Sequence, residues 1–220
     1  PLLYQRDGQM VRITLNRPEV LNAINSTMPE ELADAVERAN AEPEVRVIVL
    51  LGAGRSFCAG YDLDAYAQTP GTNPGIQEMP WDPLKDFSFM KRNTDQFMSL
   101  WRSPLPVVAK IQGHALAGGC GLASVCDLSI ASDDAKLGYS EVKIGFIPAI
   151  VSVFLLRKIG ESKTKELLLT GKTISATEAV SIGLINQVVS KDILDDTVHG
   201  REKVQRRRGR KQPQRRNSRT

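Results

Sequence analysis

The chain has 220 residues, of which 41% are hydrophobic and 25% are charged, as is typical of one globular domain with a sizeable core. Two histidines and three cysteines argue against a histidine-based metal site and a disulfide framework, and no apolar run is long enough to span a bilayer. The net charge of +4 comes from residues 201–220, which hold 10 of the 29 basic and one of the 25 acidic residues, so that residues 1–200 carry −5.

Hydrophobic patterns along the chain predict strands that alternate with helices. Alternating or continuous apolar runs predict strands over 10–15, 45–51, 107–111, 128–131, 136–138 and 184–189. Helical spacing predicts helices over 28 to about 40–43, 87–101, 148–159, 162–169 and 175–183. The strand over 45–51 is almost wholly apolar, which indicates that both of its faces are covered. This alternation predicts an α/β fold class.

Local signals mark where several of these elements begin and end. Capping-box spacing occurs from Thr27 to Glu30 and from Ser175 to Glu178. We expect a short helix over 62–67 and, from its prolines and glycines, a loop beside the site over 68–83. An apolar stripe then predicts a core-facing helix, one edge of which is a candidate lining of a binding pocket: Phe87, Met90, Thr94, Phe97, Met98 and Trp101.

Two stretches of small residues each follow an apolar strand. Residues 115–121 read Ala-Leu-Ala-Gly-Gly-Cys-Gly, and residues 58–63 read Cys-Ala-Gly-Tyr-Asp-Leu. Small residues at the start of a helix let a ligand approach bare backbone N–H groups at the positive end of the helix dipole. Close packing of a helix on a strand would explain the same glycines, so these stretches alone leave both interpretations open.

Further motifs in the same order give the chain a family resemblance. They are Leu15-Asn16-Arg17-Pro18, Leu21-Asn22-Ala23, Cys126-Asp127 and the run from Glu141 to Pro148. With the two small-residue stretches, they resemble the enoyl-CoA hydratase/isomerase family, the crotonase superfamily, over about 11–189. The resemblance implies a spiral of ββα units in one catalytic domain over 1–198, assembled as a homotrimer or hexamer. It implies an acyl-CoA substrate, no cofactor beyond the coenzyme A of that substrate, and a cytoplasmic location, or the mitochondrial or peroxisomal matrix in a eukaryote.

The resemblance also assigns candidate site residues. Backbone N–H groups of Ala59 and Gly118 would form an oxyanion hole for the thioester carbonyl. Glu141 would be the catalytic base and acid; the alternative is a surface glutamate paired with Lys143 or Arg157. The expected substrate-binding residues are Ala59, Gly60, Tyr61, Asp62, Leu63 and Gly118. The loop over 19–22 would also contact coenzyme A, with Arg17 as the nearest cation.

One departure from the family pattern concerns the reaction. Hydratases of the family typically use two glutamates, and the position of the first is Gly121 here. One base suffices to isomerise a 3-enoyl-CoA to a 2-enoyl-CoA, whereas hydration needs water held beside Glu141. We expect Gly121 to leave space for a larger or polar acyl group, and residues 149–152 to make a drier pocket than the family's glycine-rich turn. The predicted function is 2-enoyl-CoA hydration, with isomerisation as the alternative.

The basic tail over 199–220 suggests a function of another class. Its arginines lack interleaved aromatic residues and could hold nucleic-acid phosphates non-specifically, with strongly salt-dependent affinity. We nevertheless expect nucleic acid not to be a physiological partner. The family continues in helices past residue 189, whereas this tail has too few apolar residues to bury a helix face. A reading-frame shift would explain such an arginine-rich run, and we expect a disordered tail and weakened assembly.

Overall fold

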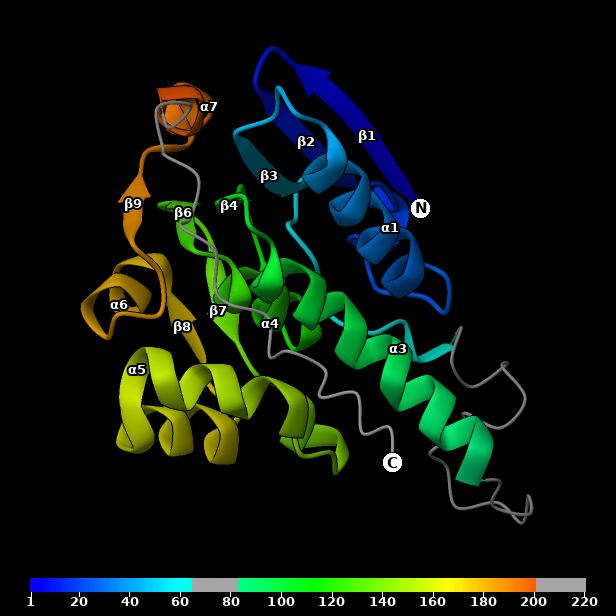
Figure 1. Cartoon of the computed structure of the whole chain (residues 1–220). Helices are drawn as coiled ribbons and strands as arrows, with labels where there is room; N and C mark the ends of the chain where they lie inside the picture. Colours follow the sequence, from blue (N-terminus) through cyan, green and yellow to red (C-terminus); the bar gives the residue numbers. More distant parts are fainter. Residues whose placement is uncertain (65–82, 201–220) are drawn as a thin grey trace, which may run out of the picture.

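Strand β3 lies inside the larger of two sheets in the computed structural model, which describes residues 1–64 and 83–200 (Figure 1). This six-stranded sheet has the order β1-β2-β3-β4-β6-β9, and its strands after the antiparallel β1–β2 hairpin are parallel. Their bounds are β1 Leu2–Asp7, β2 Met10–Leu15, β3 Val47–Gly52, β4 Val107–Ile111, β6 Leu128–Ser132 and β9 Gln187–Val189. The smaller sheet contains β5 Ala115–Leu116, β7 Lys136–Gly138 and β8 Thr173–Ser175.

Helices alternate with these strands, as the sequence predicts for an α/β fold. The α-helices are α1 Met28–Ala41, α3 Pro83–Arg102, α4 Gly118–Val125, α5 Ala149–Thr170, α6 Ala176–Ser181 and α7 Leu194–His199. Short 3-10 helices are η1 Pro18–Val20, η2 Glu141–Ile144 and η3 Lys191–Ile193. None of the described helices is long and apolar enough to cross a membrane.

Side chains of β3 pack into two separate cores. Ile48 and Leu50 belong to the main core, which α1, α3, α4 and α5 share with the sheet. Val47 and Val49 point to the other face and join a smaller core with Leu194 of α7. Successive side chains of a strand alternate between faces, so the nearly all-apolar run over 45–51 is explained by burial on both sides, as predicted.

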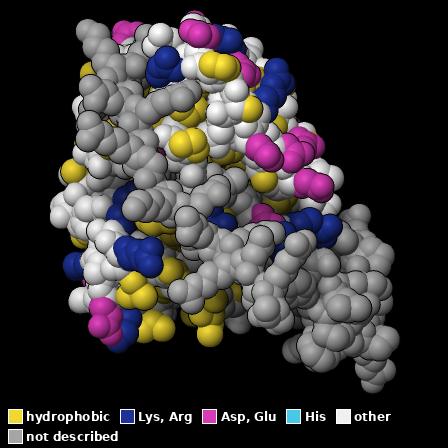
Figure 2. Space-filling view, viewed as in Figure 1, with side chains coloured by type: hydrophobic (Ala, Val, Ile, Leu, Met, Phe, Trp, Pro, Cys, Tyr) yellow, Lys and Arg dark blue, Asp and Glu magenta, His cyan; other side chains and the backbone are white. Residues whose placement is uncertain are grey.

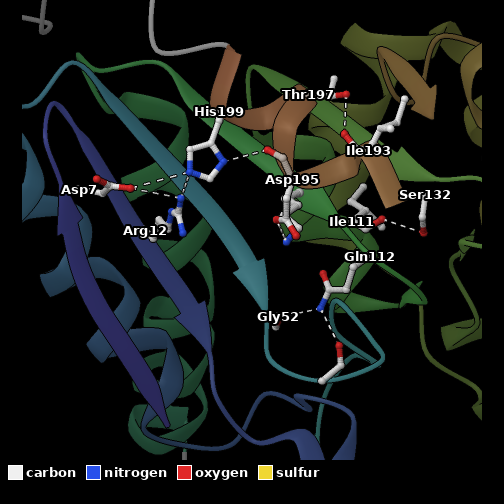
Figure 3. Close-up of polar contacts among 12 residues, drawn as sticks. Asp7, Arg12, Gly52, Ile111, Gln112, Ser132, Ile193, Asp195, Thr197 and His199 are labelled. Carbon is white, nitrogen blue, oxygen red and sulfur yellow. Dashed lines mark hydrogen bonds and ion pairs between the residues drawn. The ribbon is translucent and has the colours of Figure 1, made fainter. Parts of the chain in front are cut away.

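Polar contacts attach α7 to the opposite end of the chain (Figure 3). The His199 ring contacts the Arg12 guanidinium, and His199 Nε2 lies 3.8 Å from Asp7 Oδ2. Lys110 of β4 pairs with Asp195. These contacts hold the last described helix against the β1–β2 hairpin and cover the second core.

Two predicted helix starts have different capping. At α6 the Ser175 hydroxyl accepts a hydrogen bond from Glu178 N at 3.1 Å, as the predicted capping box requires. At α1 the helix begins where expected, but Thr27 makes no cap, so the predicted capping box is wrong. Asn25 Oδ1 accepts from Met28 N at 3.0 Å instead, because the side chain two residues earlier reaches the first helical N–H.

The predicted separation of the helices over 148–159 and 162–169 is present as a break at Gly160 within α5. Gly160 has φ 74° and ψ 173°, which are non-helical, and Figure 1 shows α5 folded back on itself. Residues 63 and 64 are helical and residue 62 is not, while residues 65–67 of the predicted 62–67 helix lie outside the described residues. So do residues 68–82 of the expected loop, the side chains of Phe87 and Met90, and the tail beyond residue 200.

Candidate active site

The two small-residue stretches lie side by side. Leu116 N–H donates to the Cys58 carbonyl oxygen at 2.9 Å, and Phe57 and Cys58 both donate to the His114 carbonyl oxygen. A Cβ at Gly119 would lie 2.3 Å from the Cys58 carbonyl oxygen, so this crossing excludes any side chain there. Stretches that are more than fifty residues apart in the sequence therefore form one surface.

Gly118 presents an unused backbone donor at the start of α4. Its N–H has no hydrogen-bond acceptor in the described part of the chain, and the preceding Ala117 has φ 48° and provides no side-chain cap. A Cβ at Gly118 would lie 2.7 Å from Tyr61 Cε2, so glycine allows the Tyr61 ring to pack against this turn. The first N–H groups of a helix have no partner within the helix and carry its positive partial charge.

Ala59 requires a correction. Its N–H donates to the Leu21 carbonyl oxygen at 3.0 Å, which occupies the donor that the resemblance assigned to the oxyanion hole. The Leu21 loop is itself anchored, since Asn22 Nδ2 donates to the Ser56 carbonyl oxygen at 2.9 Å. Gly60 lies close to the unused donor: a Cβ on it would lie 3.5 Å from Gly118 N, and its φ of 102° turns the chain there.

Glu141 opens η2, directly after the turn that follows β7. Its Oε2 is buried and has no hydrogen-bond partner among the residues that the structure describes. Burial raises the pKa of the Glu141 carboxyl above its ordinary value, and a hydrogen bond from its own backbone opposes part of that rise. No ion pair among the described residues includes Glu141, while Arg157 lies over the Trp101 ring at 5.9 Å. The alternative of a surface glutamate paired with Lys143 or Arg157 is therefore not supported.

A cavity of about 570 Å³ joins these groups. The volume is within the usual range for small-molecule sites. Most of the lining is apolar and comes from both small-residue stretches, α3, η2 and the start of α5: Ala59, Tyr61, Leu63, Asn93, Phe97, Ala117, Gly118, Ser140, Glu141, Lys143, Ile144, Phe146, Ile147, Pro148, Ala149, Ile150 and Val151. Within the described chain, no group of three or more His, Cys, Asp or Glu residues could hold a metal ion.

Gly60 and Asp62 are the predicted binding residues that do not line this cavity. The Asp62 carboxylate lies 2.8 Å from Arg17 Nη2, and both side chains are largely buried. Arg17 Nη1 also donates to the Ala23 carbonyl oxygen at 2.7 Å. Asp62 and Arg17 thus fix two loops to each other, and the cation that the sequence placed nearest to coenzyme A already has partners.

The sequence did not predict every residue of the cavity lining, and one prediction about the space beside Gly121 is wrong. Asn93 on α3 was not singled out, and Phe146 and Ile147 stood only within the family motif, although Phe97 was a candidate through the stripe on its helix. Residues 149–152 were expected at the pocket, and Ala149, Ile150 and Val151 line it. The expectation that Gly121 leaves space for a larger or polar acyl group is wrong. A Cβ at Gly121 would lie 2.5 Å from Val151 Cγ1 and 3.0 Å from Phe97 Cε1, because those side chains already fill the space.

Comparison with known proteins agrees with the fold. Residues 5–206 match a family profile described as enoyl-CoA hydratase/isomerase. The chain belongs to the enoyl-CoA hydratase/isomerase family. Among solved structures, an enoyl-CoA hydratase of Mycobacterium smegmatis superposes with a TM-score of 0.82 and 34% identity, over 91% of this chain and 74% of that one. The crotonase-type α/β fold that the resemblance implied is thereby confirmed.

Relatives within the family carry hydratase names. A Thermus thermophilus protein with an enoyl-CoA hydratase assignment is 40% identical over 181 residues, which are 82% of this chain and 68% of that protein. The enoyl-CoA hydratase EchA19 of Mycobacterium tuberculosis is 37% identical over 188 residues, 85% of this chain and 67% of its own length. These relatives favour the predicted hydratase over the isomerase alternative, and the chain is a hydratase-type enzyme of the family.

Proposed function

We propose that this family member adds water to a 2-enoyl-CoA thioester, with Glu141 as the base and acid. The observation that carries the proposal is one cavity that contains both the buried Glu141 carboxylate, whose Oε2 has no hydrogen-bond partner among the described residues, and the unused Gly118 N–H. A carboxylate with a raised pKa can take and return a proton near neutral pH more readily than an exposed one.

The proposed oxyanion hole uses backbone donors. Gly118 N–H would hold the thioester oxygen, and the second donor would come from the backbone at Gly60 and Tyr61, which lies beside Gly118. This replaces Ala59, whose N–H is bonded to Leu21. As water adds, charge moves to the thioester oxygen, and losing one preorganised donor typically costs about 3–4 kcal/mol of transition-state stabilisation.

Glu141 would handle both proton transfers. It takes a proton from water while the hydroxyl oxygen bonds to C3 and the C2–C3 double-bond electrons move toward the thioester oxygen. The same carboxylic acid then returns the proton to C2, which completes the addition. Glu141 is the one carboxylate in the described lining, so water must be held by it and by neighbouring backbone groups rather than by a second glutamate.

The remaining assignments are expectations within this proposal. Residues 1–198 would form the catalytic domain, and coenzyme A would lie along the segment over 59–63, with no other cofactor. Hydrophobic side chains are exposed over α5 and just before it (Figure 2), among them Ile147 at 83% and Leu169 at 72% exposure. This surface supports self-association as the expected trimer or hexamer. The cytoplasm is the expected location.

Supplying a 2-enoyl-CoA and a 3-enoyl-CoA separately tests the reaction. Hydration removes the absorbance of the conjugated thioester from the first substrate and forms a 3-hydroxyacyl-CoA. Isomerisation instead creates that absorbance from the second substrate. Gain of absorbance from the 3-enoyl-CoA, with no hydroxyacyl product from the 2-enoyl-CoA, would replace the hydratase proposal with the isomerase.

A further inference from the structure

Gly121 lies almost one helical turn after Gly118 on α4, so both residues face the same side of the helix. The place that a side chain at 121 would take is occupied from two other helices. Val151 Cγ1 of α5 lies 2.5 Å from the position of a Gly121 Cβ, and Phe97 Cε1 of α3 lies 3.0 Å from it. The three residues are therefore complementary in shape, with the missing side chain of one matched to the branched and aromatic side chains of the others.

Two members of this group, Val151 and Phe97, form part of the cavity wall, and Gly121 packs against them from behind. Val151 is 4% exposed and Phe97 is 1% exposed, and both line the cavity that contains Glu141. The Phe97 ring lies 6.5 Å from the Phe154 ring, which in turn lies 5.3 Å from the Trp101 ring. Aromatic packing between α3 and α5 thus supports the wall from behind, so it cannot withdraw freely when a ligand presses on it.

The chemistry of the wall is hydrocarbon. Val151 presents methyl groups and Phe97 a ring edge, and neither can form a hydrogen bond to a polar group on a ligand. An acyl carboxylate or hydroxyl pressed against them would lose water without gaining a partner. Lys143, a cation in the same lining, has its stem against Gly171 rather than against Gly121.

We infer that Gly121, Val151 and Phe97 form a specificity wall, which restricts the acyl group to hydrocarbon and limits its bulk beside the thioester carbonyl. The inference rests on the proposed function, since it assumes that an acyl-CoA occupies this cavity. Within that function it names the substrate class: unsubstituted alkyl-type enoyl groups in preference to those that carry a second carboxylate or a large branch.

Binding of saturated acyl-CoAs by calorimetry tests the wall without any reaction. Val151→Ala removes two methyl groups and should raise the affinity for a branched acyl-CoA, relative to a straight-chain one, by about tenfold. Val153→Ala is the matched control, because Val153 is on the same helix but half exposed and outside the cavity lining. If Val151→Ala fails to fold, Phe97→Leu offers a second way to enlarge the cavity at this wall.

A paired substitution tests shape complementarity. Gly121→Ala places a methyl group against Val151 and should weaken acyl-CoA binding or lower the melting temperature, whereas Gly121→Ala with Val151→Ala should recover most of that loss. In the wild-type chain, glutaryl-CoA should bind about tenfold more weakly than pentanoyl-CoA, because its carboxylate meets hydrocarbon.

Several results would overturn the inference. They are equal selectivity in Val151→Ala and Val153→Ala, no recovery in the paired variant, or equal affinity for glutaryl-CoA and pentanoyl-CoA. Failure of the proposed function can be told apart from these results. If the chain shows the expected selectivity but hydrates no 2-enoyl-CoA, the specificity wall stands and the hydratase proposal is wrong. Absence of binding for every acyl-CoA overturns both.

Discussion

Glu141, the proposed base, has a buried carboxyl that also affects the stability of the fold. Burial raises its pKa in the folded chain above the ordinary 4.5. Its protonated form therefore contributes stability that is fully present below the unfolded pKa and is lost as pH rises through the folded pKa. At neutral pH the ionised carboxylate destabilises the fold relative to a neutral group of the same shape.

Glu141→Gln should therefore melt at a higher temperature than the wild-type chain at about pH 7, and the difference should shrink toward about pH 4, where the wild-type carboxyl is protonated. Melting temperatures of both proteins across this range check the expectation. A melting temperature for Glu141→Gln below that of the wild type at neutral pH would mean that the carboxylate has stabilising partners, contrary to its unpaired Oε2.

Adjacent glycines at the start of α4 should respond differently to alanine. Gly118→Ala directs a methyl group at the Tyr61 ring, which can shift, so we expect strongly reduced turnover with a modest loss of stability. Gly119→Ala places a methyl group 2.3 Å from the Cys58 carbonyl oxygen, and the backbone must move. Thermal melts and turnover of the pair measure the contrast; equal turnover in Gly118→Ala and wild type would remove Gly118 from the site.

Some features of the candidate site could be predicted from the sequence and others could not. Gly118 and Glu141 stand in motifs with fixed spacing, so the resemblance could propose both as site residues, and both line the cavity. The Ala59 N–H donates to the carbonyl oxygen of Leu21, which lies in another loop, and no local sequence pattern predicts that hydrogen bond. Likewise Gly121 suggested empty space, because the side chain that fills it comes from Val151, thirty residues later.

Helix α5 depends on a backbone conformation at Gly160 that other residues rarely adopt. Its φ of 74° and ψ of 173° belong to a region almost confined to glycine, although a Cβ there would meet no neighbouring atom. Gly160→Ala should therefore destabilise the fold by about 1–3 kcal/mol through backbone strain alone.

Gly200→Ala is the matched control for that substitution. Gly200 has φ −60° and ψ −10°, and it also has open space around its Cβ position, so alanine should be neutral or slightly stabilising. Chemical denaturation of both variants measures the difference in the free energy of unfolding. Equal effects would mean that the turn at Gly160 can adopt an ordinary helical geometry.

Elements with strong periodicity were predictable, and those that depend on partners were not. Strands β2, β3 and β4 follow from their apolar patterns, and Gly160 and Gly171 mark the helix ends. Strand β1 has no fully buried side chain and forms by pairing with β2. The two residues of β5 form a strand by pairing with β7. Such short strands carry too few side chains to show a pattern.

Charge is distributed unevenly over the whole molecule. Residues 201–220 account for the change from −5 in residues 1–200 to +4 in the full chain. We expect a chain truncated after residue 200 to keep its affinity for acyl-CoA, because the described cavity lining lies within 59–151. Any retention on DNA should fall steeply with salt in the full chain and vanish in the truncated one. Salt-resistant retention by the truncated chain would contradict this expectation.

The most direct test of the hydratase account is the rate at which Glu141→Gln hydrates a 2-enoyl-CoA, measured beside its affinity for a saturated acyl-CoA. Glu161→Gln is the control, because Glu161 is an exposed carboxylate on α5 that pairs with Lys165 outside the cavity. We expect kcat/KM to fall by about 10²- to 10⁴-fold in Glu141→Gln, with affinity preserved and the control unaffected. Hydration by Glu141→Gln at the wild-type rate would contradict the account.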